Sequence, residues 1–367
     1  AKENSPKLKE FDRLKNVYSF QEKYSLSLPN PKVYFGFNNI ELNKPYLSSS
    51  NPMGSFSVGL TAEYVPLSKR KAEKQVFSKE KDIVDADREI FERQLIRQIK
   101  ENYAEFVFSL RKEKILNQQI KLYQNYKKTL EESYKYGKAE LKDLMAVDIK
   151  ILELQKQIEE TKKARETIKN NIFYLIGGEF PLKEYDDLNS ENVEIKDIDS
   201  SPYIKQINLN IEKIDKEVEK AKKQSFPNFE FSTEYMYRTG LPDMVSFKVG
   251  IQIPIFKSKK EDLLVLQKKE EKFLKQLDLE DQKLKLKSVV NSSKLVYEKN
   301  LKILKLYNQI LKEKENQIKA VNLALKYNKA EVSEVLKLLD EILQTKLDML
   351  NVELENYKIT FQLEEVL

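Results

Sequence analysis

The stretch that decides the fold is "YGKAELKDLM", from Tyr136 to Met145, because a close copy returns as "YNKAEVSEVL" from Tyr327 to Leu336, 191 residues later. Other matching stretches come before it in the same order. "FSVGL" from Phe56 matches "FKVGI" from Phe247 at the same offset, and an "SP" dipeptide recurs at an offset of 196. Ordered repeats with loop-sized slippage indicate an internal duplication, so we expect two similar halves.

Each half is expected to hold a helix, two strands, a long descending helix, a tip and a returning helix. In the first half, residues 1–178, these elements are expected at 6–24, 31–41, 55–66, 68–135, 136–140 and 141–176. In the second half, residues 201–367, they are expected at 202–224, 228–238, 244–255, 258–326, 327–331 and 332–366. Residues 179–200 are polar and irregular, and we expect them to connect the two halves.

The long helices are predicted from coiled-coil spacing and from the absence of helix breakers. Neither Pro nor Gly occurs from about 68 to 134 or from about 258 to 327. Apolar residues seven apart, with charged residues between them, are typical of packed long helices. In the second half these residues are Val290, Tyr297, Leu304 and Leu311, then Leu336, Leu343, Leu350 and Tyr357. At 1.5 Å per residue each descending helix is roughly 100 Å long, so it must lie against a returning helix.

Four segments alternate apolar and polar residues over nine or ten positions, which predicts strands. A soluble sheet with one face on a core would show this alternation, and so would the wall of a transmembrane barrel. We favour the barrel because the polar faces carry Glu63, Glu230, Glu234 and Lys248, which a closed core would not accept unpaired. The residues expected to face lipid are Phe35, Phe37, Phe56, Val58, Leu60, Phe229, Phe231, Tyr235, Phe247, Val249 and Ile251.

Four strands cannot close a barrel, and an open sheet edge is not tolerated in lipid. Two chains would give an eight-stranded barrel, and side chains would fill its interior. Three chains would give twelve strands around a water-filled lumen. The expected fold class is therefore α+β: a duplicated helical hairpin with two strands, assembled as a homotrimer with a 12-stranded β-barrel continued by a 12-helix α-barrel.

Composition excludes several classes of function. The 367 residues include no Cys, His or Trp, which removes thiol and His-based catalysis and the usual zinc sites, so we expect no enzyme, no cofactor and no bound metal. The 65 Lys and Arg are interleaved with 59 Asp and Glu, which does not indicate a nucleic-acid surface. No apolar run is long enough for a transmembrane helix.

The chain resembles the TolC-like family of outer-membrane efflux proteins. The resemblance covers nearly the whole chain and is carried by the order of its elements, by "SLPNPKV" and "VGIQIPIF" around the strands, and by the two tips. The tip residues concerned are Tyr134, Gly137, Asp143 and Leu144, and then Leu325, Asn328, Glu334, Val335 and Leu336. "LPNP" leans toward the heavy-metal efflux branch of the family.

The resemblance implies a passive trimeric exit duct of a tripartite efflux or type I secretion system. Such a duct sits in the outer membrane of a Gram-negative bacterium, in contact with its lipid, and extends into the periplasm. Its implied partners are a periplasmic adaptor (membrane fusion) protein and an inner-membrane pump of the RND or ABC type.

The tips and an acidic gate are the implied functional sites. The tips are helix-hairpin turns in any case, and the resemblance implies that they also dock the adaptor; the residues concerned are Tyr136, Gly137, Lys138, Ala139, Glu140 and Leu141, with Tyr327, Asn328, Lys329, Ala330, Glu331 and Val332. Glu334 matches one gate acid of the family, but Lys337 stands where a second would fall, so Asp340 and Glu341 are candidate substitutes. An acid near a helix N-terminus is also what an ordinary helix prefers.

Two other functions stay open. A soluble coiled-coil scaffold would keep the heptads but has no use for four strands with aromatic faces. A periplasmic adaptor also contains a helical hairpin, but adaptors have a single hairpin flanked by lipoyl-like β domains, whereas this chain has two hairpins and few glycines.

Overall fold

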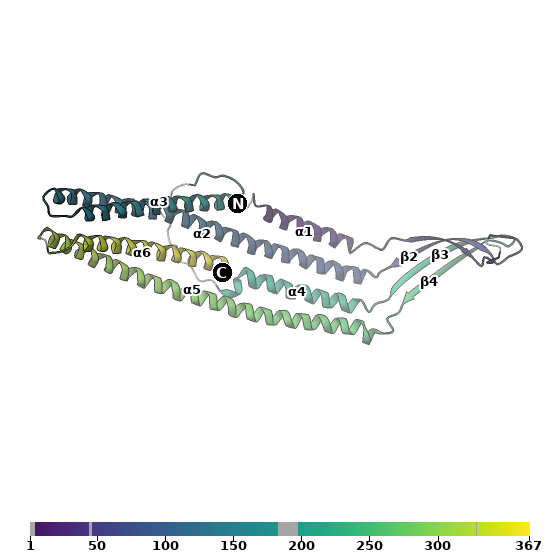
Figure 1. Ribbon diagram of the computed structural model, residues 1–367. Helices are drawn as coiled ribbons and strands as arrows, with labels where there is room; N and C mark the ends of the chain where they lie inside the picture. Colours follow the sequence, from purple (N-terminus) through teal and green to yellow (C-terminus); the bar gives the residue numbers. More distant parts are fainter. Residues whose placement is uncertain (1–3, 44–45, 183–196, 328) are drawn as a thin grey trace. The chain divides into compact units, whose positions relative to one another are not determined.

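A computed structural model describes residues 4–43, 46–182, 197–327 and 329–367. The chain is mostly helical with a small antiparallel sheet, and its two halves contain the same series of elements (Figure 1). The first half holds α1 (Pro6–Tyr24), β1 (Lys32–Asn38), β2 (Ser55–Tyr64), α2 (Leu67–Lys135) and α3 (Leu141–Ile176). The second half holds α4 (Pro202–Lys223), β3 (Asn228–Arg238), β4 (Met244–Gln252), α5 (Glu261–Lys326) and α6 (Val332–Val366).

Three strands are shorter than expected, and α5 starts later. β1 ends at Asn38 because Asn39 has a positive φ of 52°, which takes the backbone out of the extended region. β2 and β4 end two residues before Pro66 and Pro254, whose missing N–H cannot join a ladder. α5 begins at Glu261 instead of 258 because Lys257–Lys259 forms a short 3₁₀ turn. Most of the expected connector, residues 183–196, lies outside the described residues.

The chain divides into two compact units that each contain parts of both halves. The helical unit comprises Ala1–Lys9, Arg88–Tyr203 and Lys283–Leu367, and the sheet unit comprises Glu10–Asp87 and Ile204–Gln282. Helices α2 and α5 each contribute residues to both units. Because each unit combines residues from both halves, neither repeat is a compact domain by itself.

The sheet unit contains a four-stranded antiparallel sheet in the order β1-β2-β3-β4. Its helices follow the same order, as ion pairs between neighbours indicate. Lys15 of α1 binds Asp85 of α2 at 2.6 Å, and Lys213 of α4 binds Glu80 of α2 at 2.7 Å. Lys268 of α5 then binds Glu217 of α4 at 2.8 Å. Helices α1 and α5 are therefore the outer helices of this unit, as β1 and β4 are its outer strands.

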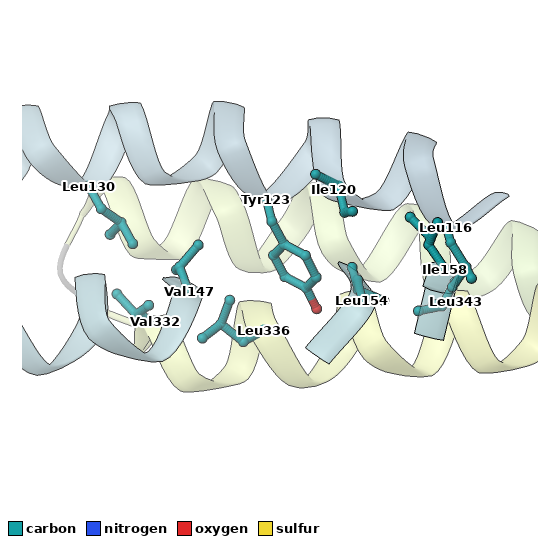
Figure 2. Close-up of a cluster of buried hydrophobic side chains, with 10 residues drawn as sticks. All are labelled: Leu116, Ile120, Tyr123, Leu130, Val147, Leu154, Ile158, Val332, Leu336 and Leu343. Atoms are coloured by element: carbon teal, nitrogen blue, oxygen red, sulfur yellow. The ribbon is translucent and has the colours of Figure 1, made fainter. Parts of the chain in front are cut away.

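The helical unit packs the returning helices against the descending helices of both hairpins. The returning helix α3 is tied to α2 by Lys127 and Asp148, whose Nζ and Oδ1 atoms are 2.6 Å apart. Helix α6 contacts α2 through Arg97 and Glu365 at 2.6 Å. The core combines residues from α2, α3 and α6, and Figure 2 shows them as Leu116, Ile120, Tyr123, Leu130, Val147, Leu154, Ile158, Val332, Leu336 and Leu343.

Among the described residues, each helix either is too short or carries too many polar side chains to cross a lipid bilayer.

Candidate functional site

The strand register places all eleven residues that were expected to face lipid on one face of the sheet. In one row across the sheet, Phe35 lies opposite Val58, which lies opposite Tyr235. In the next row, Leu60 lies opposite Thr233. The remaining rows join the other members across the strands in the same way: Phe37 with Phe56, Phe231 with Val249, Phe229 with Ile251, and Thr233 with Phe247. Aromatic residues of this face, including Phe35 and Phe247, are exposed, so no part of the described chain covers it. That lipid covers it stays a prediction.

The other face of the same sheet is polar and partly filled by one tyrosine. The ring of Tyr34 lies over Gly59, where an added Cβ would come within 2.1 Å of the tyrosine Cζ. Any larger residue at Gly59 would therefore displace the ring. Lys248 reaches Glu234 at 3.5 Å, and Asn228 donates to Glu63 at 3.0 Å, so charged groups on this face have polar partners.

The two edges of the sheet are unpaired among the described residues. β1 pairs with β2 and β4 pairs with β3, which leaves one side of each outer strand without a ladder. An open edge beside an exposed apolar face is a template for pairing with another chain.

The outer helices of the sheet unit also expose apolar side chains. On α1 the exposed residues are Leu14, Val17, Phe20 and Tyr24. On α5 they are Leu263, Leu266, Phe273 and Leu277. Monomeric soluble proteins seldom expose such continuous stripes, so both helices have a surface suited to burial against another molecule.

The helical unit has the same property at its own outer helices, α3 and α5. Leu141, Met145, Ile149 and Leu152 form an exposed stripe on α3. On α5 the exposed residues Leu284, Leu295 and Leu306 follow one another at intervals of eleven, which keeps them on one face of the helix. In each unit, the outer helix on either side therefore carries an exposed apolar stripe.

The first tip closes α2 with backbone hydrogen bonds and opens α3 with a capping box. The N–H of Lys138 donates to the carbonyl of Ser133 at 2.9 Å, with Gly137 at φ 68°, as in a helix end that needs a left-handed residue. Glu140 is the N-cap of α3, and its N–H donates to Asp143 Oδ2 at 3.0 Å. Tyr136, Lys138, Glu140 and Leu141 are exposed, and Ala139 is half-buried.

The second tip repeats the backbone hydrogen bond that closes its descending helix, but its N-cap Glu331 lacks the capping box of the first tip. Lys329 donates its N–H to the carbonyl of Ala324 at 2.9 Å, and Glu331 is the N-cap of α6. Tyr327, Lys329 and Glu331 are exposed, Ala330 is half-buried and Val332 is buried in the core. Asn328 lies outside the described residues. Apart from Val332, the described tip residues are exposed or half-buried, and adaptor docking on them stays a prediction.

The three candidate gate acids lie in different environments. Glu334 is exposed, and the structure gives its carboxylate no cation within the described part of the chain. Asp340 instead accepts a hydrogen bond from the Tyr123 hydroxyl at 2.6 Å and an ion pair from Lys150 at 3.0 Å. Glu341 pairs with Lys314 at 3.4 Å. Among the described residues, Asp340 and Glu341 therefore have cationic partners and Glu334 does not, and the acidic ring stays a prediction.

Tyr123 and Lys150 are contacts of Asp340 that the sequence did not reveal. Figure 2 shows the Tyr123 side chain pointing from α2 into the core toward α6. Burial and the hydrogen bond to Asp340 raise the pKa of Tyr123, so its hydroxyl stays a donor at neutral pH. Hydrogen bonds to Asp340 and Glu153 raise the pKa of Lys150. The sequence signal for the Tyr123–Asp340 contact was a Tyr at a heptad position where a Leu would pack equally well.

No family model matches the amino-acid sequence, and no curated protein matches it. Solved structures match over the whole chain. CusC, described as forming a transmembrane channel, is 13% identical with a TM-score of 0.84, over 100% of this chain and 90% of that one. The outer membrane protein VceC of Vibrio cholerae is 13% identical with a TM-score of 0.79, over 99% and 92%. The open-state MtrE outer membrane channel of Neisseria gonorrhoeae is 13% identical with a TM-score of 0.77, over 99% and 86%.

The chain has the fold of a TolC-like outer-membrane channel. The resemblance found in the sequence is thereby confirmed at the level of fold. The TolC-like fold also accounts for the duplicated series of elements, in which each half supplies one helical hairpin and two adjacent strands.

Proposed function

We propose that the protein is the passive exit duct of a tripartite efflux or type I secretion system in the outer membrane of a Gram-negative bacterium. Three copies form a 12-stranded barrel through the membrane and a 12-helix duct in the periplasm. A periplasmic adaptor and an inner-membrane pump of the RND or ABC type supply the substrate and the energy. The similarity of fold to outer-membrane channels supports this proposal.

The sheet is the observation that carries the proposal. One face is apolar in every row and exposed, the opposite face is polar, and both edges are unpaired among the described residues. A soluble scaffold or an adaptor would have to leave that aromatic face in water, at about 25 cal/mol for each Å² of apolar surface. In a barrel the same face meets lipid, the polar face meets water, and each edge pairs with a neighbouring copy.

The apolar stripes on the outer helices support assembly from several copies. In a ring, α1 of one copy would face α5 of the next in the sheet unit, and α3 would face α5 in the helical unit. Each contact buries residues that are exposed in the single chain, such as Phe20 and Phe273, or Met145 and Leu295. Three copies is the smallest number whose barrel would hold a water-filled lumen.

The experiment is reconstitution of the purified protein into planar lipid bilayers. The proposal predicts discrete ion-conducting steps, together with the mass of a trimer in detergent. Absence of steps from a protein that is also monomeric in detergent would refute the duct. As an internal check, a variant with Phe35, Phe231 and Phe247 changed to Asp should fail to insert, because charges on the lipid face are costly in the bilayer.

The gate is proposed to rest on Glu334. Three copies would bring three such carboxylates around one axis, where they attract cations into the entrance. The variant Glu334→Gln should reduce the preference of the pore for cations over anions, as measured by reversal potentials in a salt gradient. Glu166→Gln, an exposed change on α3 at a distance from the tip, is the matched control. Unchanged selectivity in Glu334→Gln would remove the gate assignment.

A further inference from the structure

A second repeated stretch lies on the descending helices, upstream of the tips. Residues 114–128 of α2 read "KILNQQIKLYQNYKK", and residues 305–319 of α5 read "KLYNQILKEKENQIK", again 191 residues apart. The two stretches are identical at six of fifteen positions. The identical pairs are Lys114 and Lys305, Asn117 and Asn308, Gln118 and Gln309, Lys121 and Lys312, Asn125 and Asn316, and Lys128 and Lys319.

Every one of these twelve residues is exposed, whereas the packed positions between them have changed. Leu116, Ile120 and Tyr123 of the core correspond to Tyr307, Leu311 and Lys314 in the second stretch. Packing constrains core positions most strongly, so a duplicated helix that only had to fold would keep its core and vary its surface. Here the surface is the part that the two copies share.

The six residues of each stretch lie on one face of their helix. At 100° per residue they fall within about 100° of arc, and they extend over roughly 20 Å along the axis. We call them the first lysine strip, on α2, and the second lysine strip, on α5. The equivalent Asn117 and Asn308 even make the same contact, each donating to the backbone carbonyl four residues earlier at 3.0 Å.

The lysines of both strips are available for an outside partner. None of the six has an ion pair within the described part of the chain, although adjacent cations do: Lys127 binds Asp148, and Lys314 binds Glu341. No acidic residue occurs between Lys114 and Lys128. Glu313 and Glu315 lie in the second stretch and leave that strip less positive than the first. Beside the first strip, Lys346 lines a shallow groove between α2, α5 and α6, in which Arg111 pairs with Glu353 at 3.9 Å.

We propose that each lysine strip binds one acidic α-helix of a partner protein, so that a single chain holds two such helices. The lysines of a strip are seven residues apart, which is the interval at which a helix lying alongside presents carboxylates in line. The amides between them add neutral hydrogen bonds. That this partner is the periplasmic adaptor rests on the proposed function. Docking would then continue from the tips along both hairpins, because the strips end eight residues before Tyr136 and Tyr327.

The test uses the full-length protein in detergent and a synthetic, helical 28-residue peptide with one Glu in each heptad. A fluorescent label on the peptide reports binding by anisotropy at low salt. The wild type should bind two peptides per chain. Lys114→Glu, Lys121→Glu and Lys128→Glu together should leave one site, as should the equivalent changes at Lys305, Lys312 and Lys319. All six changes together should weaken binding by about tenfold or more. They are combined because each exposed Lys–Glu pair contributes little alone.

The control is a triple change to Glu at Lys287, Lys294 and Lys299, which are exposed on α5 but have no lysine at the equivalent positions of α2. It alters the net charge equally and should leave binding intact. Equal loss in the control, one site in the wild type, or equal binding of a peptide with scrambled Glu positions would overturn the proposal. Binding of anionic vesicles through the same lysines, with none of the peptide, would assign the strips to lipid instead. Bilayer conductance of the six-fold variant is scored separately, so a failed strip and a failed duct are told apart.

Discussion

The two returning helices, α3 and α6, hold the same heptad positions in their hairpins but bury them differently. Met145 on α3 is 59% exposed, and its counterpart Leu336 on α6 is 7% exposed. Leu152 is 63% exposed, and its counterpart Leu343 is 7% exposed. Duplication supplied two similar apolar stripes, and only the second is covered within the chain. The difference indicates that α6 is an inner helix of the helical unit and that α3 is an edge helix awaiting a neighbour.

The largest expected effect separates these two helices by stability. Leu343→Ala should lower the free energy of unfolding by about 2–4 kcal/mol, because it opens a cavity in a packed core. In the dissociated single chain, Leu152→Ala should change it by no more than about 0.5 kcal/mol, since the side chain is exposed there. Denaturant unfolding followed by helical circular dichroism measures both.

The same pair sharpens the assembly proposal. Leu152→Ala should lower the fraction of trimer at limiting protein concentration, because it removes apolar surface from the proposed contact between copies. If Leu152→Ala and Leu343→Ala were equally destabilising, or if Leu152→Ala left the trimer intact at every concentration, the contrast between α3 and α6 would be wrong.

A smaller effect distinguishes the two descending helices by how their contribution to the unfolding free energy depends on pH. Burial, with the charge of Asp143 nearby, raises the pKa of Tyr126 on α2 to about 12, from an unfolded value of 10.0. The equivalent position on α5 is Gln317, which does not titrate. A raised folded-state pKa means that the contribution of the neutral phenol is present below pH 10 and is lost as the pH rises toward 12.

Between pH 9 and pH 11.5 the wild type should therefore lose about 1–2 kcal/mol more unfolding free energy than Tyr126→Phe. Parallel unfolding curves at the two pH values measure the difference, and the variant corrects for the other groups that titrate there. The same loss in both proteins would show that this phenol is not buried in its neutral form.

The smallest effect concerns the tips. Gly137 has a φ of 68°, and an added Cβ would meet no atom within 4 Å, so the cost of a side chain is conformational. Gly137→Ala should destabilise by about 1 kcal/mol, and Gly137→Asn by a few tenths, in line with Asn at the equivalent place in the second half. Gly178→Ala, at an open position without a positive φ, is the control. If the two Ala variants were equally stable, the left-handed requirement at the tip would be refuted.

Much of the fold was readable from the sequence because its signals are local. Heptads and the absence of Pro and Gly defined the long helices, and period-two alternation defined the strands. The expected strands included Pro66 and Pro254, whereas β2 and β4 end two residues before these prolines. The repeated decapeptide located the turns between the helices. The apolar residues of the four strands fell on one face of one sheet because a regular register preserves alternation.

Other features depend on contacts between distant residues and left no local signal. Asp340 is bound by Tyr123 and Lys150, which lie on other helices, so its carboxylate looked as free as that of Glu334. The positive φ of Asn39 ended β1 early without a proline to announce it. The repeated lysines could have been found in the sequence by comparing residues 191 apart upstream of the tips. Their exposure became known only from the packing.

The central claim is that the exposed edges of the chain close onto neighbouring copies in a ring of three. Native mass spectrometry of the detergent-solubilised protein tests it most directly. The predicted result is one dominant species at three times the chain mass of 43.3 kDa, which falls to single chains when Met145 and Leu152 are both changed to Asp. A dominant single chain in the wild type, or a dimer, would contradict the claim.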